Sequence, residues 1–433
     1  MVGFLLTFIF PLVNSGLIYP TQVRLSWTEK EQQIRVSYRQ VTSTESYIAY
    51  RPILCQDNPE WTYLLTDKTR IDVGRYGSRM QFLHSGVISN LTEECLYQYA
   101  VGQGLFWSDT YVFSGRTPEY TSLNDQKPAK FIIFGDWGAK VGHYTKYLLK
   151  QQARFRDFEG ILHMGDIAYN LHTDEGLVGD LFLEMIQEFS AEFPYMTLPG
   201  NHEYHFNNAS QYMDRFKMPW NEYNQGTSLY YSFDFGLTHF IMFNTEFYLM
   251  KHSGPEGQLQ LEWLKKDLEK AKLRRKQKPW VVLLTHHPFY CNVDWTRSLH
   301  DRNTECGIDA PKLRGILEDL LNSYSVDLVF HGHLHNYERD APVYKNTTVL
   351  SELDTLNLHL NPKAPVYITS GNAGNKLKRN DPVSTTLQDW CRAVSQDYGY
   401  GKLHVYNRTH VLWEQYSSEK LKRIDHLWII KNI

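Results

Sequence analysis

The sequence has almost no excess of charge of either sign. Lys and Arg together number 45 and Asp and Glu 48, which leaves a formal net charge of -3 over 433 residues. A chain so nearly neutral has no electrostatic basis for binding nucleic acid or an acidic membrane surface. The basic residues of 265–278 fall on the solvated side of an expected helix, because Leu261, Leu264 and Leu268 have helical spacing. We therefore predict no nucleic-acid partner.

Long hydrophobic runs are also scarce. The apolar stretch 2–13 is interrupted by Pro11 and is shorter than the about 20 residues that span a bilayer. Small residues follow it, so it predicts a secretory signal peptide over residues 1–16, although no Lys or Arg precedes the apolar core. A membrane anchor is the alternative interpretation. Because no later stretch qualifies as a membrane span, we predict a secreted or lysosomal protein of the secretory pathway.

Cysteine is infrequent, with five in the chain. In an oxidising compartment Cys55 and Cys95 are one candidate pair and Cys291 and Cys306 another, although the sequence alone does not fix the pairing. Cys391 would then be free or linked to another molecule. Together with the sequons this predicts a glycoprotein with disulfides, whose acceptor sites are Asn90, Asn208, Asn346 and Asn407.

Internal repeats, low-complexity tracts and heptads are absent from the sequence. Hydrophobic residues make up 42% of the chain, which is enough for a large core in more than one domain. The first unit, residues 17–118, contains short runs of largely alternating polarity. They predict a small antiparallel β-sandwich with strands near 23–27, 34–38, 46–50, 96–101 and 110–113. This unit carries no cluster of ligand residues. We interpret it as a structural pedestal, with partner binding or shaping of the substrate rim as alternatives.

A linker is expected over residues 117–130, which contain Pro118, Asn124 and Pro128. Beyond it, the second unit, residues 119–433, alternates strand and helix patterns and predicts a layered α/β/β/α domain with sheet at its centre. The expected helices cover 143–154, 176–189, 258–272 and 311–323. The expected strands include 228–233, 240–244, 365–369, 402–406 and 410–415.

Histidines gather after the run 326–330, which is apolar apart from Asp327 and has the character of a buried strand. His331, His333 and His335 alternate there, and Gly332 lets the backbone turn. Neutral imidazole is a common ligand of zinc, iron and manganese. Histidines near a strand end are also frequently structural, so this stretch becomes a candidate metal site only if other ligands join it.

Other strand-like runs supply such ligands. In an α/β sheet, the loops that leave the carboxyl ends of strands converge on one crevice, so residues at several strand ends can share a site. Potential ligands follow the runs 131–134, 161–164, 195–198 and 281–284, and they are Asp136, Asp166, Tyr169, Asn201, His202, His286 and His287.

The ordered motifs G-D-x-G at 135–138, G-D-x-x-Y at 165–169, G-N-H-E at 200–203 and G-H-x-H at 332–335 resemble those of the calcineurin-like metallophosphoesterases. The tyrosine narrows the resemblance to the purple acid phosphatases. It covers residues 118–415 well, and the order of domains resembles that of the long, plant-like members. The resemblance implies an N-terminal, fibronectin-type antiparallel β-sandwich followed by an α/β/β/α metallophosphoesterase sandwich.

Carried over residue by residue, the resemblance also implies a binuclear centre. Its first metal would be Fe(III), and the second a divalent Zn, Fe or Mn ion. Carboxylate and phenolate oxygens suit the harder ion, and imidazole and amide groups suit the softer one. The implied ligands are Asp136, Tyr169 and His335 on the first metal, Asn201, His286 and His333 on the second, and Asp166 bridging both.

The charges of this set favour binding of a phosphate monoester. Two aspartates and a tyrosinate bring about -3, a bridging hydroxide about -1, and a trivalent plus a divalent ion about +5. The cavity therefore keeps a positive charge. We predict a metal-dependent acid phosphatase in which a metal-bound hydroxide attacks phosphorus in line. A phosphodiesterase or nucleotide-pyrophosphate hydrolase on the same site is one alternative, and a secreted binding glycoprotein without catalysis is another.

The acid that protonates the leaving group is the least determined part of the site. His202 follows the ligand Asn201 and is the first candidate to bind the phosphate together with Asn201 or to protonate the alkoxide. His287 is the second, although a core histidine fits its position equally well. Plant-type members carry a proton-donating histidine in the loop that here spans 290–306. That loop holds only His300, which does not fall at the matching offset.

Overall fold

The structure, a computed structural model, describes residues 19–55, 59–73, 79–93, 95–115, 128–205, 208–250, 254–292, 305–351, 353–375 and 386–432. The predicted signal peptide 1–16 lies outside the described residues, as do most of the expected linker and the segment 293–304 with His300. Within the described ranges, no helix combines the length and the apolar character needed to cross a bilayer.

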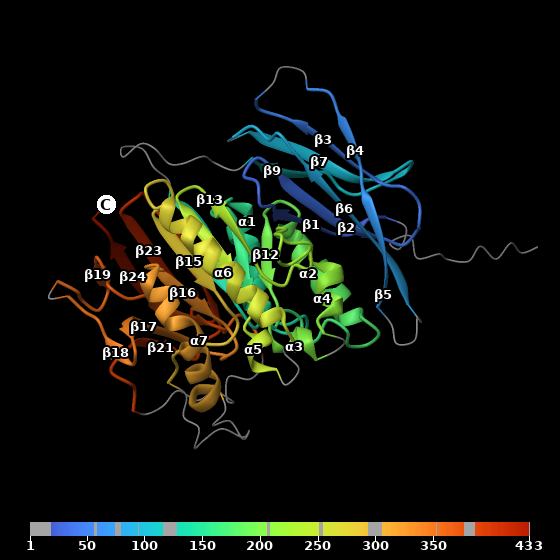
Figure 1. Ribbon diagram of the computed structural model, residues 1–433. Coiled ribbons are helices and arrows are strands. Elements are labelled where there is room, and N and C mark those ends of the chain that lie inside the picture. The colour runs from blue at the N-terminus through green and yellow to red at the C-terminus, as the bar shows by residue number, and fades with distance from the viewer. Residues whose placement is uncertain are drawn as a thin grey trace, which may run out of the picture.

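Residues 21–114 form two antiparallel sheets that pack face to face (Figure 1). One has the order β1-β2-β6-β5 and the other β4-β3-β7-β8, with β9 also paired to β7. Val36, Ile48 and Tyr99 belong to the core between them. The predicted antiparallel β-sandwich is confirmed. Its strands are β1 (Thr21–Trp27), β2 (Ile34–Gln40), β3 (Tyr47–Pro52), β4 (Thr62–Leu65), β5 (Asp67–Asp72), β6 (Met80–Ile88), β7 (Leu96–Gln103), β8 (Phe106–Trp107) and β9 (Tyr111–Ser114).

Residues 129–430 contain two larger sheets packed against each other. The aromatic rings of Phe131 and Phe240, one from each sheet, lie 4.8 Å apart, and so do those of Phe330 and Trp413. The first sheet has the order β12-β11-β10-β22-β23-β24-β19 and comprises β10 (Ala129–Phe134), β11 (Gly160–Met164), β12 (Tyr195–Leu198), β19 (Leu358–Leu360), β22 (Gly399–Val405), β23 (His410–Ser417) and β24 (Lys422–Ile430).

The second sheet has the order β13-β14-β15-β16-β20-β17-β18, with β21 paired to β17. It comprises β13 (Tyr231–Phe235), β14 (Thr238–Met242), β15 (Trp280–Leu284), β16 (Leu328–His331), β17 (Tyr337–Tyr344), β18 (Thr347–Thr348), β20 (Val366–Ser370) and β21 (Cys391–Ser395).

Helices cover the outer faces of this pair of sheets, which completes the predicted α/β/β/α sandwich. α1 packs on the first sheet, where Thr145 and Ser418 share a hydrogen bond of 3.0 Å. α6 and α7 lie over β15 and β16 (Figure 1). The α-helices are α1 (His143–Arg154), α2 (Leu177–Ser190), α3 (Asn201–Tyr204), α4 (Ser210–Arg215), α5 (Glu246–Leu249), α6 (Glu256–Leu273) and α7 (Ala310–Ser323), and a short π-helix, η4 (Glu305–Asp309), precedes α7.

The β-sandwich packs directly against the larger unit. Trp27, at the end of β1, packs its ring 5.0 Å from that of Phe235 and 6.1 Å from that of Phe131. The hydroxyl of buried Tyr99 donates a hydrogen bond of 2.6 Å to the carbonyl of Ala191, directly after α2. Because buried aromatic surface and a buried hydrogen bond both cross the boundary, the two units pack as one body.

The strands that carry the candidate site run parallel within each sheet, so their carboxyl ends lie at one edge. β10, β11 and β12 are parallel neighbours, and β14, β15, β16 and β20 are too. Two glycines let the loops beyond these ends approach closely. A Cβ on Gly165, whose φ is +81°, would lie 2.6 Å from the backbone nitrogen of Gly200, and one on Gly332 would lie 2.7 Å from Asp136 Oδ2. Any side chain there would push the loops apart.

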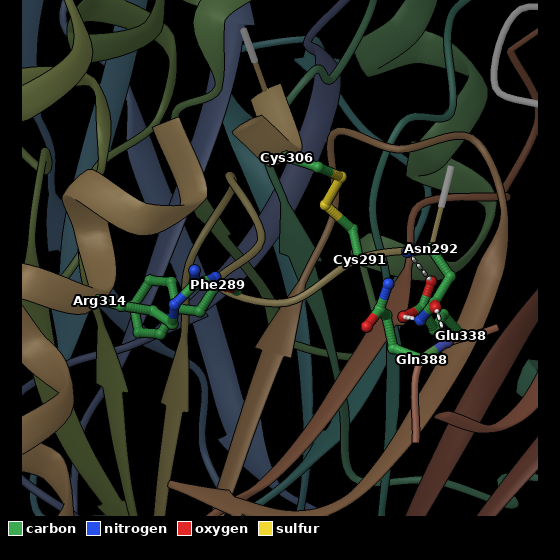
Figure 2. The surroundings of a disulfide bond; sticks show 7 residues. All are labelled: Phe289, Cys291, Asn292, Cys306, Arg314, Glu338 and Gln388. Atoms are coloured by element: carbon green, nitrogen blue, oxygen red, sulfur yellow. Dashed lines mark hydrogen bonds between the residues drawn. A yellow bond between two sulfur atoms is a disulfide. The ribbon is translucent and has the colours of Figure 1, made fainter. Parts of the chain in front are cut away.

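The loop that follows β15 is held by covalent and polar links (Figure 2). A disulfide joins Cys291 to Cys306, and another joins Cys55 to Cys95, so both expected pairs are confirmed and Cys391 is free. Next to the first bond, Asn292 donates to the buried Glu338 carboxylate through its backbone at 3.0 Å and its side chain at 2.5 Å. These links anchor the far end of the segment that begins with His286 and His287.

Candidate metal centre

The implied ligands all stand on strand ends at the shared edge. Asp136 follows β10, Asp166 and Tyr169 follow β11, and Asn201 opens α3 directly after β12. The remaining ones come from the second sheet, where His286 follows β15 and His333 and His335 follow β16. The strands before them are almost entirely buried, because neighbouring elements cover both faces of each sheet. Groups that are up to about 200 residues apart in the sequence therefore meet in one crevice.

One group of donor atoms surrounds the Tyr169 hydroxyl. It lies 2.8 Å from Asp136 Oδ1 and 2.9 Å from His335 Nε2, and the latter two atoms are 3.4 Å apart. The Asp136 side chain is fully buried. Three atoms that commonly bind metal ions therefore lie around a single point.

A second group surrounds the side-chain oxygen of Asn201. This oxygen lies 3.0 Å from His286 Nε2 and 3.1 Å from His333 Nδ1. Asp166 Oδ1 is 3.3 Å from the same His286 nitrogen. The two groups are neighbours, because donor atoms of Asp136, Asp166 and His286 all lie within 4.8 Å of one another.

The electrostatics of these groups favour cation binding. Burial raises the pKa of Asp166, but the nearby imidazoles of His286, His202 and His333 outweigh it and hold the pKa below its ordinary value. Burial and the charge of Asp136 raise the pKa of Tyr169 well above its ordinary value. Two buried carboxylates that face imidazoles and a phenol fit a pair of cations, and the phenol would ionise only when a metal replaces its proton.

Hydrogen bonds beyond the ligand atoms fix their orientation. His286 Nδ1 lies 2.7 Å from the carbonyl oxygen of Met164, which makes it the donor and leaves Nε2 free to bind a cation. The backbone N–H of His333 donates to Asp136 Oδ2 at 2.7 Å, and that of His202 donates to Asp166 Oδ1 at 2.9 Å. Each carboxylate is therefore held by the loop of another strand.

Glu203 connects the loops that follow β11 and β12. Its buried carboxylate accepts hydrogen bonds from the backbone N–H groups of Asp166, Ile167 and Gly200 at 2.8, 2.9 and 2.9 Å. Burial and the neighbouring Asp166 raise its pKa to about 8. Glu203 is the last residue of the G-N-H-E motif, but its role between the loops is visible only in the folded chain.

The two candidate general acids have different surroundings. The side chain of His202 is 28% exposed; its Nδ1 lies 2.5 Å from Asn170 Oδ1, and its Nε2 lies 3.7 Å from Asp166 Oδ2. His287 is buried, with its Nε2 3.1 Å from Glu246 Oε1 and its ring 3.9 Å from that of His333. Both histidines thus border the ligand groups. Asn170 and Glu246 are partners that the sequence did not reveal, because neither belongs to a motif.

A cleft opens beside the second group of donors. It has a volume of about 810 Å³ and is bordered by Asn201, His287 and His333 at its inner end. The predicted acceptor Asn208 is exposed at its rim. The other sequons differ in exposure, since Asn90 and Asn346 are exposed and Asn407 is half-buried.

Comparison with known families accounts for most of the described chain. Residues 20–114 match the model of the purple acid phosphatase N-terminal domain, and residues 129–337 match that of the calcineurin-like phosphoesterases. Residues 364–426 match the iron/zinc purple acid phosphatase-like protein C model.

Similar proteins cover nearly the full length. Acid phosphatase type 7 of Danio rerio is 33% identical over 95% of this chain and 91% of its own, and that of Homo sapiens is 35% identical over 82% and 78%. Probable purple acid phosphatase 20 of Arabidopsis thaliana is 28% identical over 96% and 87%. The solved purple acid phosphatase PPD1 from yellow lupin seeds superposes with a TM-score of 0.79 at 21% identity, covering 96% of this chain and 75% of its own. At that identity it supports the fold.

Proposed function

Because the chain belongs to the purple acid phosphatases, a family of calcineurin-like metallophosphoesterases, we propose that it hydrolyses phosphate monoesters as a secreted acid phosphatase. The observation that carries the proposal is the convergence of buried carboxylates, imidazoles and a phenol from five strand ends within hydrogen-bonding distance of one another. Hydrolysis breaks the P–O bond to the alcohol, the oxygen of water goes to phosphorus, and a proton goes to the alcohol.

The ligand assignment follows the two groups of donor atoms. Asp136, Tyr169 and His335 would hold Fe(III). Asn201, His286 and His333 would hold a divalent Zn, Fe or Mn ion, with Asp166 between the two. When bound, the cations supply activation of water and neutralisation of charge on the phosphate oxygens. The ionised Tyr169 would give iron its visible colour.

The remaining polar residues orient the substrate and handle its proton. Asn201 and His202 are proposed to hold the phosphate, because both stand at the start of α3 beside Asp166. The side chain of His202 is 28% exposed, so a bound ester can approach its ring and receive a proton from it. His287 is the alternative donor, since it borders the cleft in which the leaving group would lie. Two disulfides support the secretory location, because such bonds persist in oxidising compartments.

The test uses the full-length secreted protein. Its metal content and visible spectrum are measured, followed by hydrolysis of 4-nitrophenyl phosphate and bis(4-nitrophenyl) phosphate in mild acid. We expect two metals per chain, a visible band and faster cleavage of the monoester. Faster cleavage of the diester would replace the proposal with a phosphodiesterase. Absence of both metal and turnover would leave a binding glycoprotein.

A further inference from the structure

The cleft beside the centre differs in character from the centre itself. Its inner end is polar and reaches Asn201 and His333, but its walls are formed by α4, α5 and the segment before β13. A volume of about 810 Å³ is far more than a phosphate group fills. Because the cleft is continuous with the second group of donors, an ester bound there by its phosphate would place its organic part between these walls.

The walls are largely apolar. Leu229 and Phe247 are each 8% exposed, and Phe247 packs its ring 6.1 Å from that of Tyr230, so this part of the wall is fixed. Met213 on α4 and Leu249 on α5 are half-buried and extend this wall, whose polar members are Tyr204, Asn208 and Thr227. Side chains of this kind stabilise a bound apolar group by removing its surface from water.

The charged residues on the cleft have one sign. Glu246, Glu256 and Asp309 line it, and its described lining contains no Lys or Arg. Glu246 is paired with His287, whereas Glu256 stands exposed at the start of α6. A second phosphate or carboxylate on the substrate would face these carboxylates and be repelled, so the cleft selects against polyanions.

We infer that the cleft binds the organic part of the substrate and that this part is neutral and apolar. The preferred substrates are then phosphate monoesters of aryl or long-chain alkyl alcohols, and esters of polyols, nucleotides and polyphosphates are poor ones. The inference rests on the proposed phosphatase activity and adds the class of alcohol to it.

Alkyl phosphates of increasing length test the apolar wall, because their leaving alcohols differ little in acidity. The metal-loaded protein is assayed with glycerol 3-phosphate, propyl phosphate and hexyl phosphate. Hexyl phosphate should exceed propyl phosphate about tenfold in kcat/KM, mainly through a lower KM, since the added methylenes are only partly buried. Equal kcat/KM values for the propyl and hexyl esters would overturn the inference and leave the phosphatase activity intact. No turnover of any ester would instead contradict the proposed function.

Variants locate the effect in the cleft. Leu249→Asn should reduce the hexyl preference about fivefold and leave propyl phosphate within twofold of wild type. Met213→Gln tests the same wall from another helix. If Leu249→Asn fails to fold, Met213→Gln decides whether the wall causes the hexyl preference. Leu273→Asn is the matched control, because Leu273 is 85% exposed at the end of α6 and does not line the cleft. A hexyl preference that survives both cleft variants would overturn the inference.

The charge of the wall is tested separately with ATP. Glu256→Gln should raise kcat/KM for ATP about threefold, with that for hexyl phosphate unchanged, because one repulsive charge is removed near the surface. Glu262→Gln, an exposed change on the same helix outside the cleft, should alter neither value. A Glu256→Gln variant whose kcat/KM for ATP equals that of wild type would contradict the selection against polyanions.

Discussion

The backbone N–H of Asp166 donates a hydrogen bond of 2.8 Å to the buried carboxylate of Glu203. Asp166 follows a strand of the first sheet, and Glu203 lies in the short helix that begins with Asn201. The bond therefore fixes the distance between a proposed bridging ligand and a proposed ligand of the second metal. Glu203 acts by positioning, since its own oxygens face backbone donors and not the ligand atoms.

Glu203→Gln should weaken metal binding without unfolding the protein. Glutamine keeps one acceptor oxygen but turns an NH₂ group toward backbone N–H donors, so the loops would separate. We expect a 10- to 100-fold loss of metal affinity, roughly as found for residues that orient metal ligands. Metal titration of the apoprotein measures it, with the exposed Glu222→Gln as control. Activity that recovers fully at high metal concentration would agree with positioning, and unchanged affinity would refute it.

Asp166→Asn should remove metal and activity together. The amide cannot supply the negative charge that a bridging ligand needs, and we expect a loss of at least about 100-fold in kcat/KM. Asp174→Asn is the matched control, because Asp174 is exposed and also has a positive φ, of 52°. Elemental analysis and hydrolysis of 4-nitrophenyl phosphate are the measurements. Wild-type turnover in Asp166→Asn would exclude Asp166 from the centre.

Tyr169→Phe should abolish the visible band while the fold persists. The phenol is the oxygen donor to the proposed Fe(III), and the rest of the ring packs 4.4 Å from that of His202, a contact that phenylalanine keeps. The absorption spectrum and the melting temperature are compared with those of Tyr144→Phe, since Tyr144 is 60% exposed on α1. An unchanged band in Tyr169→Phe would rule out the tyrosinate.

The sequence predicted long helices more accurately than short ones, because a long helix shows its polarity pattern over several turns. α1 was predicted at its observed bounds, because its apolar periodicity persists over several turns. α3, α4 and α5 were missed, since four to six residues are too few to show a period. β5 was missed because Asp67, Lys68 and Arg70 give it the charged composition of a protected edge strand.

The sequence predicted the existence of strands more accurately than the residues at which they begin and end. The strand expected at 228–233 runs instead over Tyr231–Phe235, because Ser228 has a φ of 64° and its hydroxyl accepts a hydrogen bond from the backbone of Met218, which holds it in a turn. For the site, motifs predicted which residues would gather, but not Glu246, whose role comes from its distance to His287 in the folded chain. Partners of this kind carry no local signal in sequence.

The last prediction concerns stability and a charged group away from the centre. His239 is buried between two carboxylates, with Nδ1 2.6 Å from Asp234 and Nε2 2.8 Å from Asp267. Burial lowers its pKa, but the charges and hydrogen bonds of Asp267 and Asp234 outweigh burial and raise the pKa to about 9. The same contacts outweigh burial at Asp234 and lower the pKa of that carboxyl to about 2.

The sign of the pH dependence follows from these directions. A raised pKa means that the folded state holds the His239 proton more tightly, so the stabilisation is complete below about pH 6.5 and lost by about pH 9. It is at most about 3.4 kcal/mol, because the pKa of His239 rises from about 6.5 to about 9. The lowered pKa of Asp234 gives a contribution that is present above about pH 4 and lost toward pH 2.

His239→Gln should therefore flatten the fall in the free energy of unfolding between pH 6.5 and 9. Urea unfolding of the metal-free protein with chelator present measures this, because metal binding then adds no pH dependence of its own. The difference in the free energy of unfolding between wild type and variant should be smaller at pH 9 than at pH 6.5, by about 2 kcal/mol or more. His143→Gln, on the exposed start of α1, should run parallel to wild type. If His239→Gln also ran parallel to wild type, His239 would not be the proton-binding group, and the ring would be neutral between its two carboxylates.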